Sequence, residues 1–270
     1  MKLGISSFTY GWAVGIPGAE SPAPLTALDL VDRAGRLGVR VVQVADNLPL
    51  HGLTLEQRGR LAGRAADRGI VLEVGTRGIA AEHLRQYLAI AVELGSPILR
   101  VVIDTGHDRP SIEQAVGRLR PLVPAFEAVN VCLAIENHDR FCAPDLLRLL
   151  GALDSRAVGI CLDTANSLGA LEGPRETVKA LAPHTVNLHL KDIAARRAPS
   201  QFGLTIEGTP AGAGQLDLRW IVTQVSQNGR GANAILEQWT PPEDSLEATV
   251  AKEARWAEES IRYLRTIIPE

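Results

Sequence analysis

The chain has 270 residues, 46% of them hydrophobic, and a formal net charge of −3 at pH 7. This length suits one α/β barrel, and the apolar content excludes a mainly disordered chain. The weak net charge, without a long basic run, argues against nucleic acid as the main partner. The first residues, MKLGISSFTYGW, lack the long apolar stretch of a signal peptide, no charge-free apolar stretch is long enough to span a bilayer, and the three cysteines form no CxxC pair. We therefore expect a cytoplasmic protein with no membrane partner.

Eight short apolar runs alternate with longer amphipathic stretches, and they are rich in valine, isoleucine and leucine, as in parallel strands covered on both faces. The predicted strands are Leu3–Ser7, Val39–Ala45, Ile70–Gly75, Ile98–Ile103, Val131–Glu136, Val158–Asp163, Val186–Lys191 and Ala234–Gln238. Eight such units favour a closed (β/α)8 TIM barrel, and we expect residues 1–270 to form this single domain. An open doubly wound sheet is the rival, which the lack of a glycine-rich dinucleotide motif after the first strand disfavours.

The stretches between the strands carry helix start and stop signals. Glycines at the position of a left-handed C-cap precede three of the strands: Gly38, Gly69 and Gly95. Thr54 with Gln57 has the spacing of a capping box, and so has Asp244 with Glu247. These signals predict helices that end just before, or begin between, the apolar runs.

One connection is much longer than the others and runs from Asp192 to about residue 217. It contains Arg196, Arg197, four glycines and a short strand-like piece, Phe202–Glu207. Long connections at the carboxyl end of a barrel strand are more often functional than accidental. We predict a substrate-binding loop here.

Acids or histidine stand at the ends of four successive predicted strands: Glu136, Asp163, His189 and Glu237. A buried charge at a strand end is costly unless it is paired or coordinates a metal, and barrel enzymes carry their sites at this face. The three carboxylates would repel one another without a cation. The set predicts one divalent metal ion, Mn²⁺ or Mg²⁺ first, with Co²⁺ and Zn²⁺ as alternatives.

At these residues the sequence resembles the xylose isomerase-like barrel superfamily, which includes sugar isomerases, ketose 3-epimerases, hydroxypyruvate isomerases and endonuclease IV-type enzymes. The most specific segments are AIENH, CLDTANS, NLHLKD and AILEQW, in that order, and the resemblance covers nearly the whole chain. It implies that the four ligands hold one metal ion. It also implies that Glu136 and Glu237 are the catalytic pair, moving protons on opposite faces of the substrate.

The sequence departs from the ketose 3-epimerases at two positions. Asn166 stands where those enzymes usually have a histidine, and Cys142 stands where they often have a second glutamate. The resemblance also implies a substrate-binding arginine after the seventh strand, a role that Arg196 or Arg197 could fill. Asn166 is retained as a candidate substrate contact.

Four further residues are candidate substrate contacts: Lys191, His138, Trp12 and Arg77. Each has a structural alternative, such as an ion pair for Lys191 or support of a metal ligand for His138. Arg77 would suit an anionic substrate group. Glu73 and Arg100, on adjacent strands, are predicted to form a buried pair inside the barrel.

Three functions are compatible with this site. The first is a metal-dependent isomerase or epimerase of a small ketose or sugar derivative, acting through a cis-enediolate with the two glutamates as acid and base. The second is a lyase, a decarboxylase or eliminase, of a 3-oxo sugar or 3-oxo sugar acid. The third, a DNA-repair endonuclease, is disfavoured because the extra histidine ligands are not evident. We expect a small sugar-like substrate as the partner, with a homo-oligomer left open.

Overall fold

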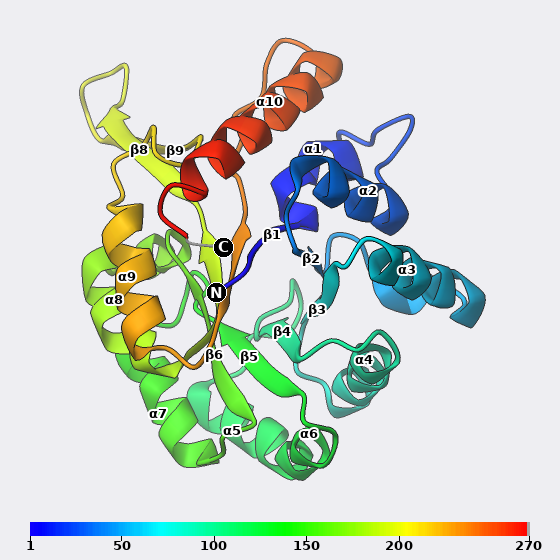
Figure 1. The fold of residues 1–270 in the computed structure, drawn as a ribbon. Coiled ribbons are helices and arrows are strands. Elements are labelled where there is room, and N and C mark those ends of the chain that lie inside the picture. Colours follow the sequence, from blue (N-terminus) through cyan, green and yellow to red (C-terminus); the bar gives the residue numbers. More distant parts are fainter. Residues whose placement is uncertain (269–270) are drawn as a thin grey trace.

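Eight parallel strands close into a barrel in the computed structural model, which describes residues 1–268. The order around the ring is β1-β10-β7-β6-β5-β4-β3-β2 (Figure 1). The strands are β1 (Leu3–Ser6), β2 (Val41–Val44), β3 (Val71–Arg77), β4 (Ile98–Val102), β5 (Cys132–Glu136), β6 (Val158–Asp163), β7 (Thr185–Leu190) and β10 (Asn233–Leu236). This confirms the predicted single (β/α)8 barrel, with strand ends that differ from the predicted ones by at most two residues.

Helices surround the barrel and cover the outer faces of its strands (Figure 1). They are α1 (Gly11–Val14), α2 (Ala27–Leu37), α3 (Leu55–Asp67), α4 (Ala81–Glu93), α5 (Ile112–Leu119), α6 (Val123–Val129), α7 (Ala143–Leu153), α8 (Pro174–Leu181), α9 (Leu218–Asn228) and α10 (Leu246–Leu264). Short 3-10 segments are η1 (Ser7–Tyr10), η2 (Leu50–Gly52), η3 (Arg120–Leu122), η4 (Asn166–Ala170) and η5 (Ala182–His184). The main apolar core lies between the sheet and these helices, and it fixes the strand ends that carry the polar residues. Among residues 1–268, none of the helices combines the length and apolar character needed to cross a bilayer.

Most of the predicted helix boundaries are confirmed. Gly38, Gly69 and Gly95 have φ angles of 67°, 63° and 65° at the ends of their helices. The Thr54–Gln57 capping box forms at the start of α3. The second box was wrong, because Ser245 rather than Asp244 caps α10 by accepting from the Ala248 N–H, so the helix begins one residue later.

The long connection after β7 forms an antiparallel hairpin of β8 (Asp192–Arg197) and β9 (Leu204–Thr209), beside α10 in Figure 1. The predicted piece at 202–207 corresponds to the second strand only. Asp192 anchors the return chain, because its carboxylate accepts the N–H groups of Gly212, Gly214 and Leu216 at 2.9, 3.0 and 3.2 Å. A Cβ at residue 214 would lie 2.1 Å from the Asp192 Oδ1, so this approach requires glycine.

The predicted Glu73–Arg100 pair is wrong. In the sheet register Arg100 lies opposite Gly75, two residues beyond Glu73, so its guanidinium points to the carboxyl end of the barrel. There it pairs with Glu136 and with Asp46. Glu73 instead accepts hydrogen bonds from three amide side chains in the barrel interior. The residue types were compatible with a pair, but the stagger between β3 and β4 separates them.

Glu253 on α10 makes stability depend on pH. Burial raises its pKa to about 7, although the N–H groups of Trp12 and Ala13 donate to its carboxylate at 3.0 and 3.1 Å. The ordinary pKa is 4.5, so between the two values the folded chain holds a proton that the unfolded chain releases. Stability from this group is therefore present at low pH and is lost as the pH rises towards the folded pKa, by at most about 3 kcal/mol.

Urea unfolding of the protein and of Glu253→Gln tests this dependence at about pH 5 and about pH 8. We expect the free energy of unfolding of the wild type, relative to that of the variant, to be lower at the higher pH than at the lower pH. A difference that stays constant with pH would mean that Glu253 is ionised throughout.

Candidate metal centre and active site

The four predicted ligands lie together at the carboxyl end of the barrel, where all four are buried. Glu136 and Asp163 end β5 and β6, His189 lies on β7, and Glu237 follows β10 directly. Asp163 and His189 are paired in the sheet register. The His189 Nδ1 lies 3.4 Å from a Glu136 oxygen, 3.4 Å from a Glu237 oxygen and 3.9 Å from an Asp163 oxygen.

The donor set fits a divalent cation. The buried His189 Nδ1 has no hydrogen-bond partner in residues 1–268, although three carboxylates face it. Two groups of close ligand atoms occur in that part of the chain, Glu136–Cys161–His189 and Asp163–His189–Glu237, and both include this histidine. One centre with mainly oxygen donors and one imidazole nitrogen suits Mn²⁺ or Mg²⁺, with Co²⁺ and Zn²⁺ as alternatives.

Two buried cations lie against the ligands. Arg100 pairs with Glu136, and its Nη1 lies 2.6 Å from the Asp46 Oδ1. The Lys191 Nζ contacts Asp163 and lies 3.0 Å from the Glu237 Oε2. Lys191 was predicted to touch substrate; it lines the cleft and also holds two of the predicted metal ligands.

These cations decide the charge of the two glutamates. Burial alone would raise the pKa of Glu136, but Arg100 and His189 outweigh it and hold that pKa below its usual value. For Glu237, the favourable charges of His189, Lys191 and Arg100 likewise outweigh burial and hold the pKa at about 2. Burial would lower the pKa of Lys191, but the surrounding carboxylates raise it above its ordinary value. Both carboxylates and the ammonium are therefore ionised at neutral pH.

Neutral side chains and the backbone hold the other carboxylate oxygens. The Asn166 Nδ2 donates to the Glu136 Oε1 at 2.7 Å, and the Ser6 hydroxyl donates to the Glu237 Oε1 at 2.9 Å. The Asp163 Oδ1 accepts two backbone N–H groups, from Ala165 and Asn166, at 2.8 and 2.9 Å. Ser6 was missed in the sequence, although its place at the end of the first predicted strand was a signal.

A cleft of about 280 Å³ opens above these residues. Its lining is Phe8, Arg77, Arg100, Glu136, His138, Asp139, Asn166, Lys191, Glu237, Gln238 and Trp239. It includes four of the predicted substrate contacts: Lys191, Asn166, His138 and Arg77. The Arg77 side chain is 33% exposed, its Nε lies 3.0 Å from the Asp46 Oδ2, and its Nη2 lies 3.5 Å from the His138 Nε2. Arg77 thus presents a solvent-accessible guanidinium at the cleft.

Three predicted substrate contacts lie elsewhere. Trp12 lines a neighbouring cleft of about 520 Å³, which shares Phe8, Gln238 and Trp239 with the first, and its indole N–H donates to a backbone carbonyl. Arg196 and Arg197 are exposed on β8 and line neither cleft. The substrate roles of these three stay predictions.

Trp239 was missed in the sequence. It is 40% exposed at the cleft, with the Lys191 Nζ 5.5 Å from its ring centre. Its position two residues after Glu237 in AILEQW was the available signal.

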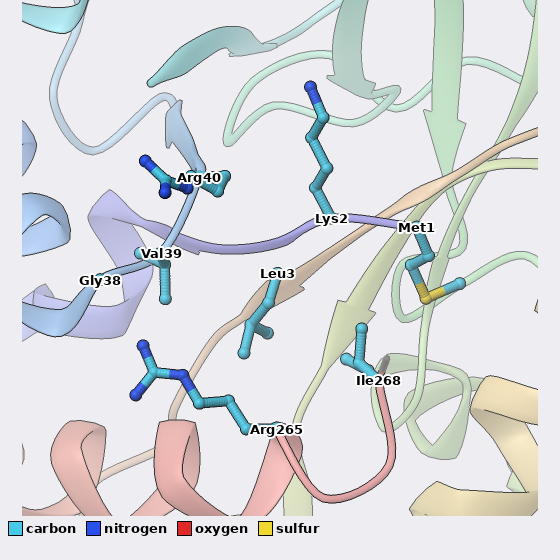
Figure 2. A pocket seen from close by; sticks show the side chains of 8 residues that line it. All are labelled: Met1, Lys2, Leu3, Gly38, Val39, Arg40, Arg265 and Ile268. Carbon is cyan, nitrogen blue, oxygen red and sulfur yellow. The ribbon is translucent and has the colours of Figure 1, made fainter. Parts of the chain in front are cut away.

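Another pocket, of about 260 Å³, lies where β1 begins and α10 ends (Figure 2). Among residues 1–268, its lining includes Lys2, Arg40 and Arg265 beside aliphatic side chains, and neither a carboxylate nor an imidazole (Figure 2). The described lining therefore offers no carboxylate or imidazole that could act as a base or ligate a hard metal ion. The cleft at the carboxyl ends of the strands is the candidate active site.

Residues 31–267 match the family model described as xylose isomerase-like TIM barrel, and the chain belongs to that family. The predicted resemblance is thus confirmed. Among curated proteins, the chain is 34% identical to the 3-oxo-isoapionate decarboxylase of Pectobacterium atrosepticum, over 100% of this chain and 97% of that one.

Solved structures share the fold at lower identity. A D-psicose 3-epimerase with D-tagatose from Clostridium cellulolyticum has a TM-score of 0.75 at 15% identity, covering 99% of both chains. A xylose isomerase-like TIM barrel protein from Mycobacterium smegmatis in complex with magnesium has a TM-score of 0.68 at 17% identity, covering 97% of both chains. At such identities the likeness establishes the barrel, and the reaction has to be argued from the site.

Proposed function

We propose that this protein is a metal-dependent decarboxylase of a 3-oxo sugar acid, the lyase alternative of the sequence-based prediction. The observation that carries the proposal is that all four carboxylate oxygens of Glu136 and Glu237 already contact a hydrogen-bond donor or a cationic group of the protein. Arg100 and Asn166 hold Glu136, and Lys191 and Ser6 hold Glu237. The full-length relative named a 3-oxo-isoapionate decarboxylase supports the same class.

Decarboxylation and epimerisation require different chemical roles of these glutamates. A 3-epimerase has to remove a proton from carbon, and a carboxylate paired with a buried cation is a weak base for that step. In a 3-oxo acid the bond to the carboxylate carbon breaks instead. CO₂ leaves, the electron pair moves into the neighbouring carbonyl as an enolate, and a proton then returns to the carbon. When bound, the divalent ion would supply the positive charge that favours the enolate.

One cation of the cleft is placed to bind an acidic substrate. Arg77, Arg100 and Lys191 line the cleft together with the carboxylates of Glu136, Asp139 and Glu237, and of the three cations the last two are buried. Arg77 alone presents a guanidinium with substantial exposure, so we assign it the substrate carboxylate, which a guanidinium binds in a bidentate way. Arg100 and Lys191 keep the glutamates ionised and oriented around the ligand centre.

Arg77→Gln is expected to raise KM for a 3-oxo sugar acid by about 10- to 100-fold, because a hydrogen bond to a charged group contributes about 1.5–3 kcal/mol. Inhibition by the neutral ketose product should change little. Steady-state kinetics measure both. The matched control is Arg109→Gln, since the Arg109 side chain is 65% exposed and outside the cleft lining. Equal KM values for Arg77→Gln and the wild type would remove Arg77 from the substrate site.

Epimerisation is the second candidate. Glu136 and Glu237 both line the cleft and leave strands that are three steps apart in the order β10-β7-β6-β5. They therefore approach a bound sugar from different sides, as an epimerase requires.

A panel of ketoses and 3-oxo sugar acids, incubated with Mn²⁺, separates the two candidates. We expect CO₂ release from the acids and no conversion of the ketoses. Conversion of a ketose to an isomer of equal mass, without CO₂ from any acid, would support the epimerase and contradict the decarboxylase.

A further inference from the structure

A hydrogen-bonded network of amide side chains and one glutamate lies inside the barrel next to His189, the predicted ligand. Gln43 on β2, Glu73 on β3 and Asn187 on β7 are fully or almost fully buried. The Gln43 Oε1 lies 2.8 Å from the His189 Nε2, the ring nitrogen that faces away from the three carboxylates. None of these three residues was singled out in the sequence as part of the site.

The direction of each hydrogen bond in this network follows from Glu73. Burial raises the pKa of Glu73, but amide nitrogens alone contact its two oxygens, so both oxygens accept: from Asn233 at 2.8 Å, Asn187 at 2.8 Å and Gln43 at 3.1 Å. The Gln43 nitrogen also donates to the Asn187 Oδ1 at 2.9 Å. Both hydrogens of the Gln43 amide are therefore used on the Glu73 side, and its oxygen has to face His189.

An amide oxygen cannot donate, so the His189 Nε2 has to carry the proton of that hydrogen bond. A charged ring also carries a proton on the other nitrogen, and once that proton leaves, as metal binding requires, that nitrogen holds only a lone pair. That nitrogen is Nδ1, the buried atom with no hydrogen-bond partner in the described chain. The lone pair points to the space bounded by Glu136, Asp163 and Glu237.

We propose that Gln43, oriented by Glu73, is a positioning residue that selects the Nε2–H form of His189 and so makes Nδ1 the metal-binding atom. A metal-bound histidine commonly donates its second N–H to such a partner, and loss of the partner weakens metal binding by about 10- to 100-fold. The inference rests on the metal site of the proposed function but not on the reaction catalysed there.

The test compares Gln43→Met, which removes the acceptor, with the exchange variant Gln43→Glu/Glu73→Gln. In the exchange variant the glutamate at 43 can still accept from Nε2–H, and the amide at 73 can supply the donors that it needs. Ser96→Ala is the control, because it deletes a buried hydroxyl that bonds to β3 and β4 far from the ligands. Mn²⁺ affinity is measured from free Mn²⁺ by electron paramagnetic resonance, and the His189 Nε2–H by ¹H–¹⁵N NMR of the Zn²⁺-loaded protein.

We expect Gln43→Met to bind Mn²⁺ about 10- to 100-fold more weakly and to lose the hydrogen-bonded Nε2–H signal, whereas the exchange variant and Ser96→Ala keep both. Unchanged affinity and signal in Gln43→Met would overturn the inference. So would a folded exchange variant that binds Mn²⁺ as weakly as Gln43→Met. Because neither readout uses turnover, a wild type that binds Mn²⁺ but releases no CO₂ would contradict the proposed function and leave this inference standing.

Discussion

Asp163→Asn is expected to remove most of the bound metal and all turnover, with Mn²⁺ affinity falling by at least about 100-fold. The Asp163 Oδ1 accepts two backbone N–H groups, so an asparagine there would keep its oxygen on the backbone. Its NH₂ group would then face the Lys191 ammonium and the ligand centre, where the carboxylate now lies. A donor would replace a charged acceptor at the point where cations meet.

The measurement is isothermal titration with Mn²⁺ together with the CO₂ assay. Glu237→Gln should behave in the same way, because it also loses a charged oxygen next to His189. Glu172→Gln is the matched control, since that carboxylate accepts from Ala143 and Thr177 and does not line the cleft. An Asp163→Asn protein that is fully metallated and active would refute the assignment of the ligands.

Arg100→Met is expected to destabilise the protein by about 3–5 kcal/mol, the effect of leaving a buried charge without its partner. The Arg100 and Glu136 side chains are 2% and 1% exposed, so water cannot replace the lost contact. Asp46 contributes less, because its side chain is 18% exposed and it retains Arg77.

Urea unfolding of the metal-free protein measures this loss. Arg100→Met/Glu136→Gln should recover part of it, because the unpaired charge is then gone. Arg118→Met is the control: its pair with Asp108 is more than a third exposed on both sides and contributes at most about 1 kcal/mol. Equal losses for Arg100→Met and Arg118→Met would show that the buried pair has no special role.

The barrel and its four predicted ligands could be inferred from local patterns. Buried parallel strands have distinctive apolar runs, and the carboxyl ends of all strands in a barrel meet at one face. Glu136 and Asp163 end such runs, Glu237 directly follows one, and His189 lies one residue before the end of another, so their convergence could be predicted without knowledge of helix packing.

The features of the site that the sequence alone could not predict depend on strand register and on long-range contacts. Arg100 reaches Glu136 rather than Glu73 because of the stagger between β3 and β4, which no local pattern encodes. The sequence does not predict β8, the first strand of the hairpin, because DIAARR lacks a regular alternation of apolar and polar residues. The amide of Gln43 acquires its role only through contacts with β3 and β7, far away in the chain.

We propose that this site breaks a carbon–carbon bond rather than removing a proton from carbon. The most direct test is a reaction in D₂O in which the Mn²⁺-activated protein acts on a 3-oxo sugar acid labelled with ¹³C in its carboxylate. The products are analysed by NMR after the metal has been chelated. We expect labelled CO₂ and bicarbonate, with one deuterium in each product molecule at the carbon that lost the carboxylate. Deuterium entering the intact acid or an epimer of it, while the labelled carboxylate stays in place, would overturn the proposed decarboxylation.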